Sequence, residues 1–459
     1  FRSPSRDGGS WRFGQRACSE TKHSPTVPRP RRPRFVRCIS AGPCLAEGMI
    51  GLTARASARL ERAVDAMRAR TSTPPRRTRT TVVLGRALGV LVLVCFLTGL
   101  YSHVLQSPPA WFPLSPRPLG LYRVTQGAHV LAGLAMIPVL LGKLWAVYPR
   151  LFTWPPVTGP LSLLERASIG LLVGSALVEV TIGVMNIAQW YAFDFSFRRV
   201  HFVLAWLLVG SVVLHVAVKL PLIVGFWRAR PVDPAAEDAP PRRTWPEQLP
   251  TDPHEAPTQS EAVSRRGALI AVGASAGAIL LGTAGQTIAP LAPLAVLSPR
   301  RPGIGPQGLP INRTAAEAGV AQSARAEDWM LEVAGARSRI RLTRDDLAAL
   351  PQTTADLPIA CVEGWSQTAT WTGVRLHDLM DLAGGTTGTG LRITSLQVRG
   401  AFSRTAMPQV YVEDPLTLVA LRLHGDELDI DHGYPARIIA PGRPGVMQTK
   451  WLSSIEVLP

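Results

Sequence analysis

The sequence predicts a membrane all-α bundle followed by an α+β domain. Five segments are apolar and long enough to cross a bilayer as helices, for which about 20 residues are needed. Beyond residue 296 these apolar runs stop, and short alternating segments separated by turns replace them, which is typical of strands and short helices. The net positive charge is also unevenly distributed along the chain, because most of the excess of basic residues precedes the first apolar segment.

The N-terminal arm, residues 1–80, holds 18 basic and 5 acidic side chains, in a chain whose net charge is +17. It is rich in Arg, Pro and Ser and poor in apolar runs, so we expect it to be disordered. A basic arm before an apolar segment is typical of a cytoplasmic flank, and no pattern in it indicates a nucleic-acid partner. Because the chain begins with Phe, we expect translation to start at Met49 or Met67.

The five apolar segments set the expected domain boundaries. The membrane domain covers 81–228, with spans near 83–104, 122–147, 166–189 and 200–226; a linker rich in Pro, Glu and Asp covers 229–263; an anchor with the fifth span, near 268–289, covers 264–292; and the last domain covers 296–459.

Basic side chains in the loops orient these spans. They gather in the arm, around the second loop and in the linker, which places these segments in the cytoplasm. Five spans then put residues 296–459 on the extracytoplasmic side of the plasma membrane, with membrane lipid as a partner. The fifth span follows Ser264-Arg265-Arg266, which resembles a twin-arginine export signal. An ordinary basic flank explains the arginine pair equally well.

Four histidines fall in or at the spans, and histidine inside a bilayer is costly and usually functional. They are His103, His129, His201 and His215. His201 and His215 lie on one face of the fourth span, about 21 Å apart along the helix axis. Because imidazole is a common axial ligand of haem iron, the bundle is predicted to carry haem b, one or two groups. Polar packing of the histidines is the alternative.

The histidine arrangement over 83–226 resembles the integral-membrane b-type cytochromes of formate dehydrogenases and hydrogenases. The resemblance implies that His129 and His201 hold an outer haem and that the bundle exchanges electrons with quinone. The sequence departs from the family at the inner haem, where the expected partner position of His215 is occupied by Arg86. His103 therefore stays open as a second outer ligand or a quinone contact. Glu179, near the middle of the third span, either faces the bundle interior or marks a proton or quinone site.

The last domain is predicted to alternate strands with two short helices. The helices run from Thr343 to Pro351 and from Leu376 to Leu382, and strands are expected near 329–333, 338–342, 391–398, 408–412, 418–423, 434–440 and 450–458.

Cys361 is the only cysteine of this domain, since Cys18, Cys38 and Cys44 belong to the arm and Cys95 to the first span. It is therefore either a buried structural thiol or a metal ligand or nucleophile. Its surroundings, Ile359-Ala360-Cys361-Val362-Glu363-Gly364-Trp365, resemble the sulfite oxidase superfamily, in which a lone cysteine thiolate ligates molybdenum. The domain is short, and in this it resembles the compact bacterial branch of that superfamily, which includes periplasmic methionine sulfoxide reductases.

A second block of sequence, 431–452, resembles the pterin-binding segment of the same superfamily. Carried over residue by residue, the resemblance implies that Mo-molybdopterin is held by Asn312, on a weaker upstream match, and by His432, Arg437, Gln448, Thr449 and Lys450. The side chains suit that ligand, since Arg binds phosphate through two parallel hydrogen bonds and Lys adds charge.

The two resemblances together imply a membrane-bound molybdenum oxidoreductase. It would transfer an oxygen atom, or two electrons, to or from a small extracytoplasmic substrate and exchange electrons with quinone through haem b. The substrate itself is not carried over. The alternative is a non-enzymatic electron-transfer cytochrome whose last domain only docks a partner, and the intact Cys361 and pterin block argue against it.

Overall fold

The computed structural model describes residues 58–59, 61–63, 78–109, 111–151, 159–228 and 265–459. The described residues from 61 onward belong to one compact unit. The predictions for most of the N-terminal arm, for its three cysteines and for the linker therefore fall outside the described residues.

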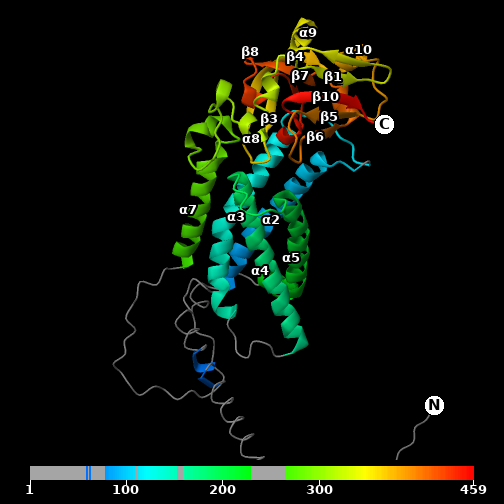
Figure 1. The fold of residues 1–459 in the computed structure, drawn as a ribbon. Coiled ribbons are helices and arrows are strands. Elements are labelled where there is room, and N and C mark those ends of the chain that lie inside the picture. The colour runs from blue at the N-terminus through cyan, green and yellow to red at the C-terminus, as the bar shows by residue number, and fades with distance from the viewer. Residues whose placement is uncertain (1–57, 60, 64–77, 110, 152–158, 229–264) are drawn as a thin grey trace, which may run out of the picture. The chain divides into compact units, whose positions relative to one another are not determined.

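Five long helices occupy the positions predicted for the spans, and each is long and apolar enough to cross a membrane (Figure 1). They are α2 (Thr78–Gln106), α3 (Leu121–Leu151), α4 (Pro160–Ile187), α5 (Phe197–Arg228) and α7 (Arg265–Ala284). Helix α7 ends five residues before the predicted end of its span. There the chain folds back on itself, and the amide of Leu297 donates to the carbonyl of Gly282.

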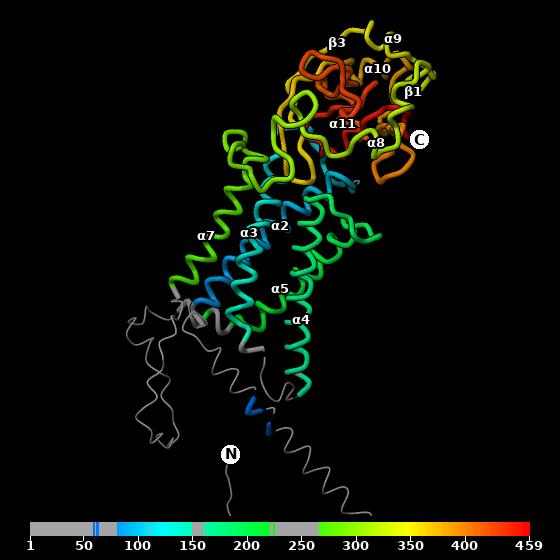
Figure 2. Tube along the Cα trace, turned by 60° about the vertical axis from the view of Figure 1, so that its left-hand side comes forward, coloured from blue at the N-terminus to red at the C-terminus, as the bar shows by residue number. Residues whose placement is uncertain are grey.

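Helix α3 packs against α2 on one side and against α7 on another, while α4 packs against α5 (Figure 2). Gly142 makes the approach of α3 to α7 possible, because a Cβ atom at this position would lie 2.6 Å from the side chain of Val272. The helices thus meet through small residues, as expected where helices pack within a bilayer.

The last domain contains two five-stranded sheets and several short helices, in agreement with the α+β prediction. One sheet has the order β2 (Arg339–Leu342), β1 (Leu331–Ala334), β10 (Leu452–Val457), β5 (Leu391–Ser395) and β6 (Arg404–Met407). The other has the order β3 (Gln352–Ala360), β4 (Ser366–Arg375), β7 (Leu418–Leu423) and β8 (Asp426–Glu427), with β9 (Arg437–Ile439) also paired to β7.

Both predicted helices are present, as α9 (Arg344–Ala349) and α10 (Leu376–Leu382). Thr343 caps α9, since its hydroxyl accepts a hydrogen bond from the amide of Asp346. The strand predicted near 408–412 is wrong, because Gln409–Val412 forms the short helix α11. Pro408 stands at its N-cap, and the turn buries Tyr411 and Val412 in the core, so apolar content here reflects burial and not strand pairing.

The longest strand pair of the domain, β3 with β4, is missing from the sequence prediction. The two strands pair in antiparallel register from Gln352 opposite Val374 to Ala360 opposite Ser366. Strand β3 contains Pro358, which cannot donate a ladder hydrogen bond and argues against a central strand. The structure resolves this because β3 lies at the edge of its sheet. The turn of this hairpin, 361–365, carries Cys361.

Candidate functional site

Cys361 stands at the first position of the hairpin turn, where both strands hold it in place. Its amide donates to the carbonyl of Trp365 at 2.9 Å, and its own carbonyl accepts from the amide of Gly364 at 3.0 Å. Gly364 has φ +97°, a conformation that favours glycine. The sequence Cys361 to Trp365 therefore folds into a tight turn that presents one buried thiol.

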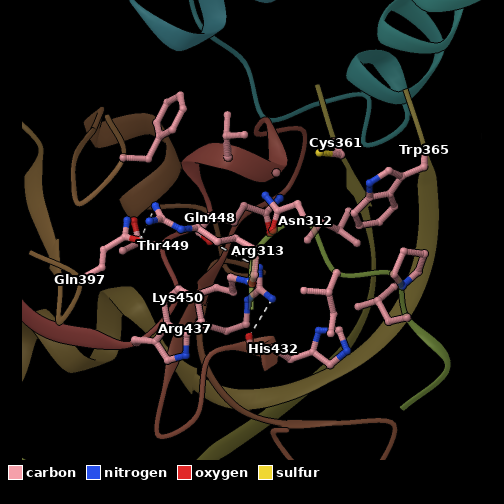
Figure 3. A pocket seen from close by; sticks show the side chains of 18 of the residues that line it. Asn312, Arg313, Cys361, Trp365, Gln397, His432, Arg437, Gln448, Thr449 and Lys450 are labelled. Carbon is pink, nitrogen blue, oxygen red and sulfur yellow. Dashed lines mark hydrogen bonds between the residues drawn. The ribbon is translucent and has the colours of Figure 1, made fainter. Parts of the chain in front are cut away.

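All seven side chains predicted to hold the molybdenum cofactor line a single cavity of about 110 Å³ beside this turn. They are Asn312, Cys361, His432, Arg437, Gln448, Thr449 and Lys450, which come from three separate stretches of the chain. Figure 3 shows Cys361 and Trp365 on one side of the cavity and Gln397 on the opposite side, with Asn312 and Arg313 between them. We call this space the cofactor pocket.

The cofactor pocket concentrates buried positive charge. Arg437 is 3% exposed, and its guanidinium donates only to carbonyl groups, those of His432 and Gln448. Lys450 likewise donates to the carbonyls of Arg313, at 2.6 Å, and Asp431, at 2.9 Å. Among the described residues, neither cation forms an ion pair with a carboxylate. Buried charges are normally paired, so this arrangement fits an anionic ligand such as a pterin phosphate.

Burial lowers the pKa values of the basic side chains in the cofactor pocket. It lowers the pKa of Arg437 to about 9 and, with the neighbouring Arg437 guanidinium, lowers the pKa of Lys450 to about 7. Burial also lowers the pKa of His432 to about 4, so that its imidazole is neutral, with Nε2 2.7 Å from the carbonyl oxygen of Pro306. A bound anion would compensate the two cations, which supports the same ligand chemistry.

The other side chains predicted to bind the cofactor differ in how many of their polar atoms already form hydrogen bonds within the protein. The Thr449 hydroxyl is 2.9 Å from that of Thr405. The amide nitrogen of Gln448 donates to the carbonyl of Arg443 at 3.0 Å, whereas its Oε1 is buried without a hydrogen-bond partner. The Nε of Arg437 is also buried without a partner. These two atoms are the unsatisfied polar groups that a ligand in the pocket would complete.

Cys361 is 2% exposed, and burial, followed by the charge of Glu363, raises the pKa of its thiol well above the usual range. In isolation this thiol stays protonated. Binding of a metal ion to a thiol displaces its proton, so a buried neutral thiol at a cofactor pocket is consistent with a metal ligand. It is not consistent with a freely ionised nucleophile.

Sequence reasoning missed a buried polar group that supports the turn. Glu363 forms an ion pair with Arg300, in which Nη1 and Oε2 are 3.0 Å apart, and also accepts a hydrogen bond from Gln189. Nε2 of Gln189 lies 2.6 Å from the carbonyl oxygen of Asn312 as well. We call Arg300, Glu363 and Gln189 the turn clamp. The only signal of the turn clamp in the sequence was a glutamate two residues after the lone cysteine.

Three of the four predicted haem ligands line a second cavity, of about 850 Å³, which we call the helix cavity. His103, His129 and His201 line it, together with Glu179. Of the alternatives left open for Glu179, the structure places it in the bundle interior, 6% exposed and paired with His201. His215 is not among the residues that line this cavity, and the ring of His103 stacks on Phe202 at 3.7 Å between centroids.

His129 and His201 face each other across the helix cavity, with ring centroids 6.1 Å apart. An imidazole–metal bond of about 2 Å on each side, together with the ring radii, separates two ligating rings by roughly this distance. Nδ1 of His129 is 2.9 Å from the carbonyl oxygen of Cys95, and Nδ1 of His201 contacts Glu179. Metal-ligating histidines usually engage one nitrogen in this way and leave the other for the metal.

Comparison with known proteins assigns the last domain. Residues 317–459 match the family described as the oxidoreductase molybdopterin binding domain. The last domain is a molybdopterin-binding oxidoreductase domain. The prediction of a molybdopterin-binding oxidoreductase domain is thereby confirmed, together with molybdopterin as the cofactor type. The prediction of a haem-carrying bundle stays a prediction.

Similar proteins include two curated relatives and one solved structure. The chain is 26% identical over 152 residues to the protein-methionine-sulfoxide reductase catalytic subunit of Campylobacter jejuni, covering 30% of this chain and 51% of that protein. It is 27% identical over 163 residues to mitochondrial sulfite oxidase of Rattus norvegicus, covering 28% of this chain and 29% of that protein. The structure of the sulfane dehydrogenase SoxCD from Paracoccus pantotrophus matches at a TM-score of 0.26 and 25% identity, over 28% of this chain and 38% of that chain.

The similarity to the curated relatives is therefore partial. The chain spans about half the length of the Campylobacter protein and less than a third of the rat enzyme. The family match covers residues 317–459, and the five long helices lie outside it.

Proposed function

We propose that the protein is a membrane-bound molybdenum oxidoreductase that transfers an oxygen atom, or two electrons, to or from a small extracytoplasmic substrate. The observation that supports this most directly is that Cys361, the buried Arg437 and the partly buried Lys450 line one pocket. When bound, Mo-molybdopterin supplies the two-electron redox chemistry. The domain's similarity to sulfite oxidase and methionine sulfoxide reductase supports a small oxo-compound as the substrate class.

The residues of the cofactor pocket divide the work of binding. Cys361 would contribute its sulfur to the metal, and a soft thiolate suits a metal that already carries dithiolene sulfurs. Arg437 and Lys450 would hold the phosphate of the pterin, because both line the cofactor pocket and their hydrogen bonds go to carbonyl groups. Gln448 would satisfy its orphaned Oε1 against a donor of the pterin ring.

The helix cavity supports the second half of the proposal, in which the bundle carries haem b and exchanges electrons with membrane quinone. The rings of His129 and His201 lie 6.1 Å apart between centroids, and the contacts of their Nδ1 atoms with Glu179 and the Cys95 carbonyl would leave Nε2 of each ring for a haem iron. This geometry favours one haem at this pair. His103 lines the same cavity and is a candidate for a quinone contact.

The proposed location is the plasma membrane, with five spans and the molybdopterin domain on the extracytoplasmic side. The five long helices are compatible with membrane insertion, and the basic loops give the orientation.

Joint analysis of the purified full-length protein for molybdenum and haem tests this function. We expect about one molybdenum per chain and a low-spin b-type spectrum that changes on addition of quinol or substrate. Assays with a sulfoxide and a reduced dye, and with sulfite and an oxidised dye, determine the direction. Haem without molybdenum would instead support the non-enzymatic electron-transfer cytochrome, and absence of both would reject the proposal.

A further inference from the structure

The turn that carries Cys361 rests directly on α3, the helix that carries His129. Nε2 of Gln126 donates a hydrogen bond of 2.7 Å to the carbonyl oxygen of Val362, the residue after Cys361. Gln126 is 5% exposed, whereas Val362 is partly exposed. Gln126 and His129 are three residues apart, a spacing that places both side chains on one face of a helix, about 4.5 Å apart along its axis.

Gly364 provides a second contact between the turn and α3. A Cβ atom on Gly364 would lie 2.9 Å from the side chain of Val130, the residue after His129. The carbonyl of Gly364 also accepts a hydrogen bond from the Thr287 hydroxyl, and the Thr287 carbonyl accepts one from Arg123 of α3 at 2.9 Å. Two backbone carbonyls of the turn are therefore fixed, one by α3 itself and one by a segment tied to α3.

The cofactor pocket and the helix cavity share part of their walls. Asn312, Arg313, Ala401, Phe402 and Val446 line both spaces. The two spaces therefore adjoin, with shared side chains between them. Ligands held in the two cavities would be close neighbours, and the contact between the turn and α3 would set their relative position.

We infer that Gln126 is a positioning residue for electron exchange between the cofactor pocket and the helix cavity. Its hydrogen bond to Val362 joins the Cys361 turn to the face of α3 that carries His129. The contact thereby fixes the position of Cys361, a potential metal ligand, relative to His129, a potential haem ligand. The connection runs from Cys361 through the Val362 carbonyl and the Gln126 side chain into the same helical turn as His129. This inference rests on the proposed function, since it requires a redox group at each end.

The electrons of the overall reaction balance with quinone as the partner. Reduction of an oxo-substrate XO consumes two electrons and two protons and yields X and water. Oxidation of a quinol to a quinone releases two electrons and two protons. In the reverse direction X takes an oxygen atom from water to give XO, and the two electrons and two protons that are released reduce quinone to quinol. Gln126 takes no part in these bond changes, and its role is to hold the two sites in register.

The variant Gln126→Leu removes the donor and leaves the Val362 carbonyl without its partner. We expect normal haem and molybdenum contents and normal turnover with a soluble dye. Quinol-linked turnover, and the reoxidation of haem by substrate in stopped flow, should fall roughly fivefold or more, the population change produced by loss of one hydrogen bond. Thr125→Val is the matched control, because the Thr125 hydroxyl donates only to carbonyls of its own helix.

A measurement independent of enzyme activity uses hydrogen exchange of the amides of 361–366 in cofactor-free protein. These amides should exchange roughly fivefold faster in Gln126→Leu than in wild type or Thr125→Val. Thr287→Val removes the hydrogen bond to the Gly364 carbonyl and should also accelerate the exchange of these amides. It replaces Gln126→Leu in the test if that variant does not fold.

Exchange and electron transfer in Gln126→Leu that both match Thr125→Val would overturn the inference and leave the proposed function standing. A wild-type protein without haem or molybdenum would instead reject the proposed function. The inference would then fall with it whatever the hydrogen-exchange result, because no pair of redox sites would remain to be positioned.

Discussion

Arg300 and Glu363 form an ion pair beneath the Cys361 turn, with Nη1 and Oε2 3.0 Å apart and the Glu363 side chain 6% exposed. Arg300 comes from the segment after α7, so the pair ties the anchor region to the cysteine turn. Burial raises the pKa of Glu363, whereas the Arg300 charge opposes that shift. The pair therefore limits the rise in the pKa of this buried carboxyl group.

Arg300→Leu should destabilise the molybdopterin domain, because it leaves the Glu363 carboxylate buried without its cation. A loss of about 2 kcal/mol in the free energy of unfolding is expected, since Arg300 is partly exposed and its pair is partly screened. Thermal unfolding of the purified protein measures it. Arg301→Leu, at the exposed neighbouring position, is the control. Equal stability of the two variants would show that the turn clamp contributes nothing.

Cys361→Ser should abolish turnover while the domain remains folded, because the change alters one potential metal ligand and little volume. The buried position of Cys361, within the pocket of the predicted cofactor ligands, motivates this expectation. Activity, molybdenum content and circular dichroism are measured together. Near-normal turnover of a folded variant would end the hypothesis that Cys361 ligates molybdenum.

His129→Leu and His201→Leu should each remove the low-spin haem signal from reduced-minus-oxidised spectra, since each would take away one axial ligand. His215→Leu should retain this signal, because His215 is not among the residues lining the helix cavity. If both single variants keep a full low-spin spectrum, the assignment is wrong, and His103 is the next residue to replace.

Binding of molybdopterin should weaken as the pH rises from 7 to 9. Burial lowers the pKa of Lys450 to about 7 in the free protein, so the lysine loses its charge across this range. A phosphate is already doubly charged there, because its second pKa is about 6. The affinity should fall by up to about tenfold per pH unit until the pH exceeds the pKa of Lys450 in the bound state.

Reconstitution of cofactor-free protein at several pH values measures this dependence. In Lys450→Arg the cation persists over the whole range, so the same titration should be nearly flat. A steep fall that is identical in wild type and Lys450→Arg would assign the titration to another group.

Export of the molybdopterin domain should require the guanidinium groups of Arg265 and Arg266. Replacing both by Lys preserves the positive flank and removes the arginine pair. The double variant should retain residues 296–459 on the cytoplasmic face, while the first four spans and their haem remain inserted. Protease accessibility from the outer face is the readout. Normal exposure of the domain in the double variant would identify the pair as a topology flank.

The sequence was sufficient for features that depend on local composition. The five long helices follow from runs of apolar residues, since a helix that satisfies its own backbone needs only length and hydrophobicity to suit a bilayer. The start of α9 followed from Thr343 and Asp346, which form their cap within one turn. The seven cofactor-pocket residues came from the resemblance, and the structure gathers them around one cavity.

Only the tertiary structure decided the features that depend on distant partners. Strand β3 accepts Pro358 because it lies at a sheet edge, and 409–412 forms a helix because it buries its apolar side chains in the core. Gln126 and Arg300 gained their roles from contacts with Val362 and Glu363, which are remote from them in the sequence. A polar side chain shows its chemistry in the sequence, but its partner is set by how the chain packs, and packing is a property of the whole fold.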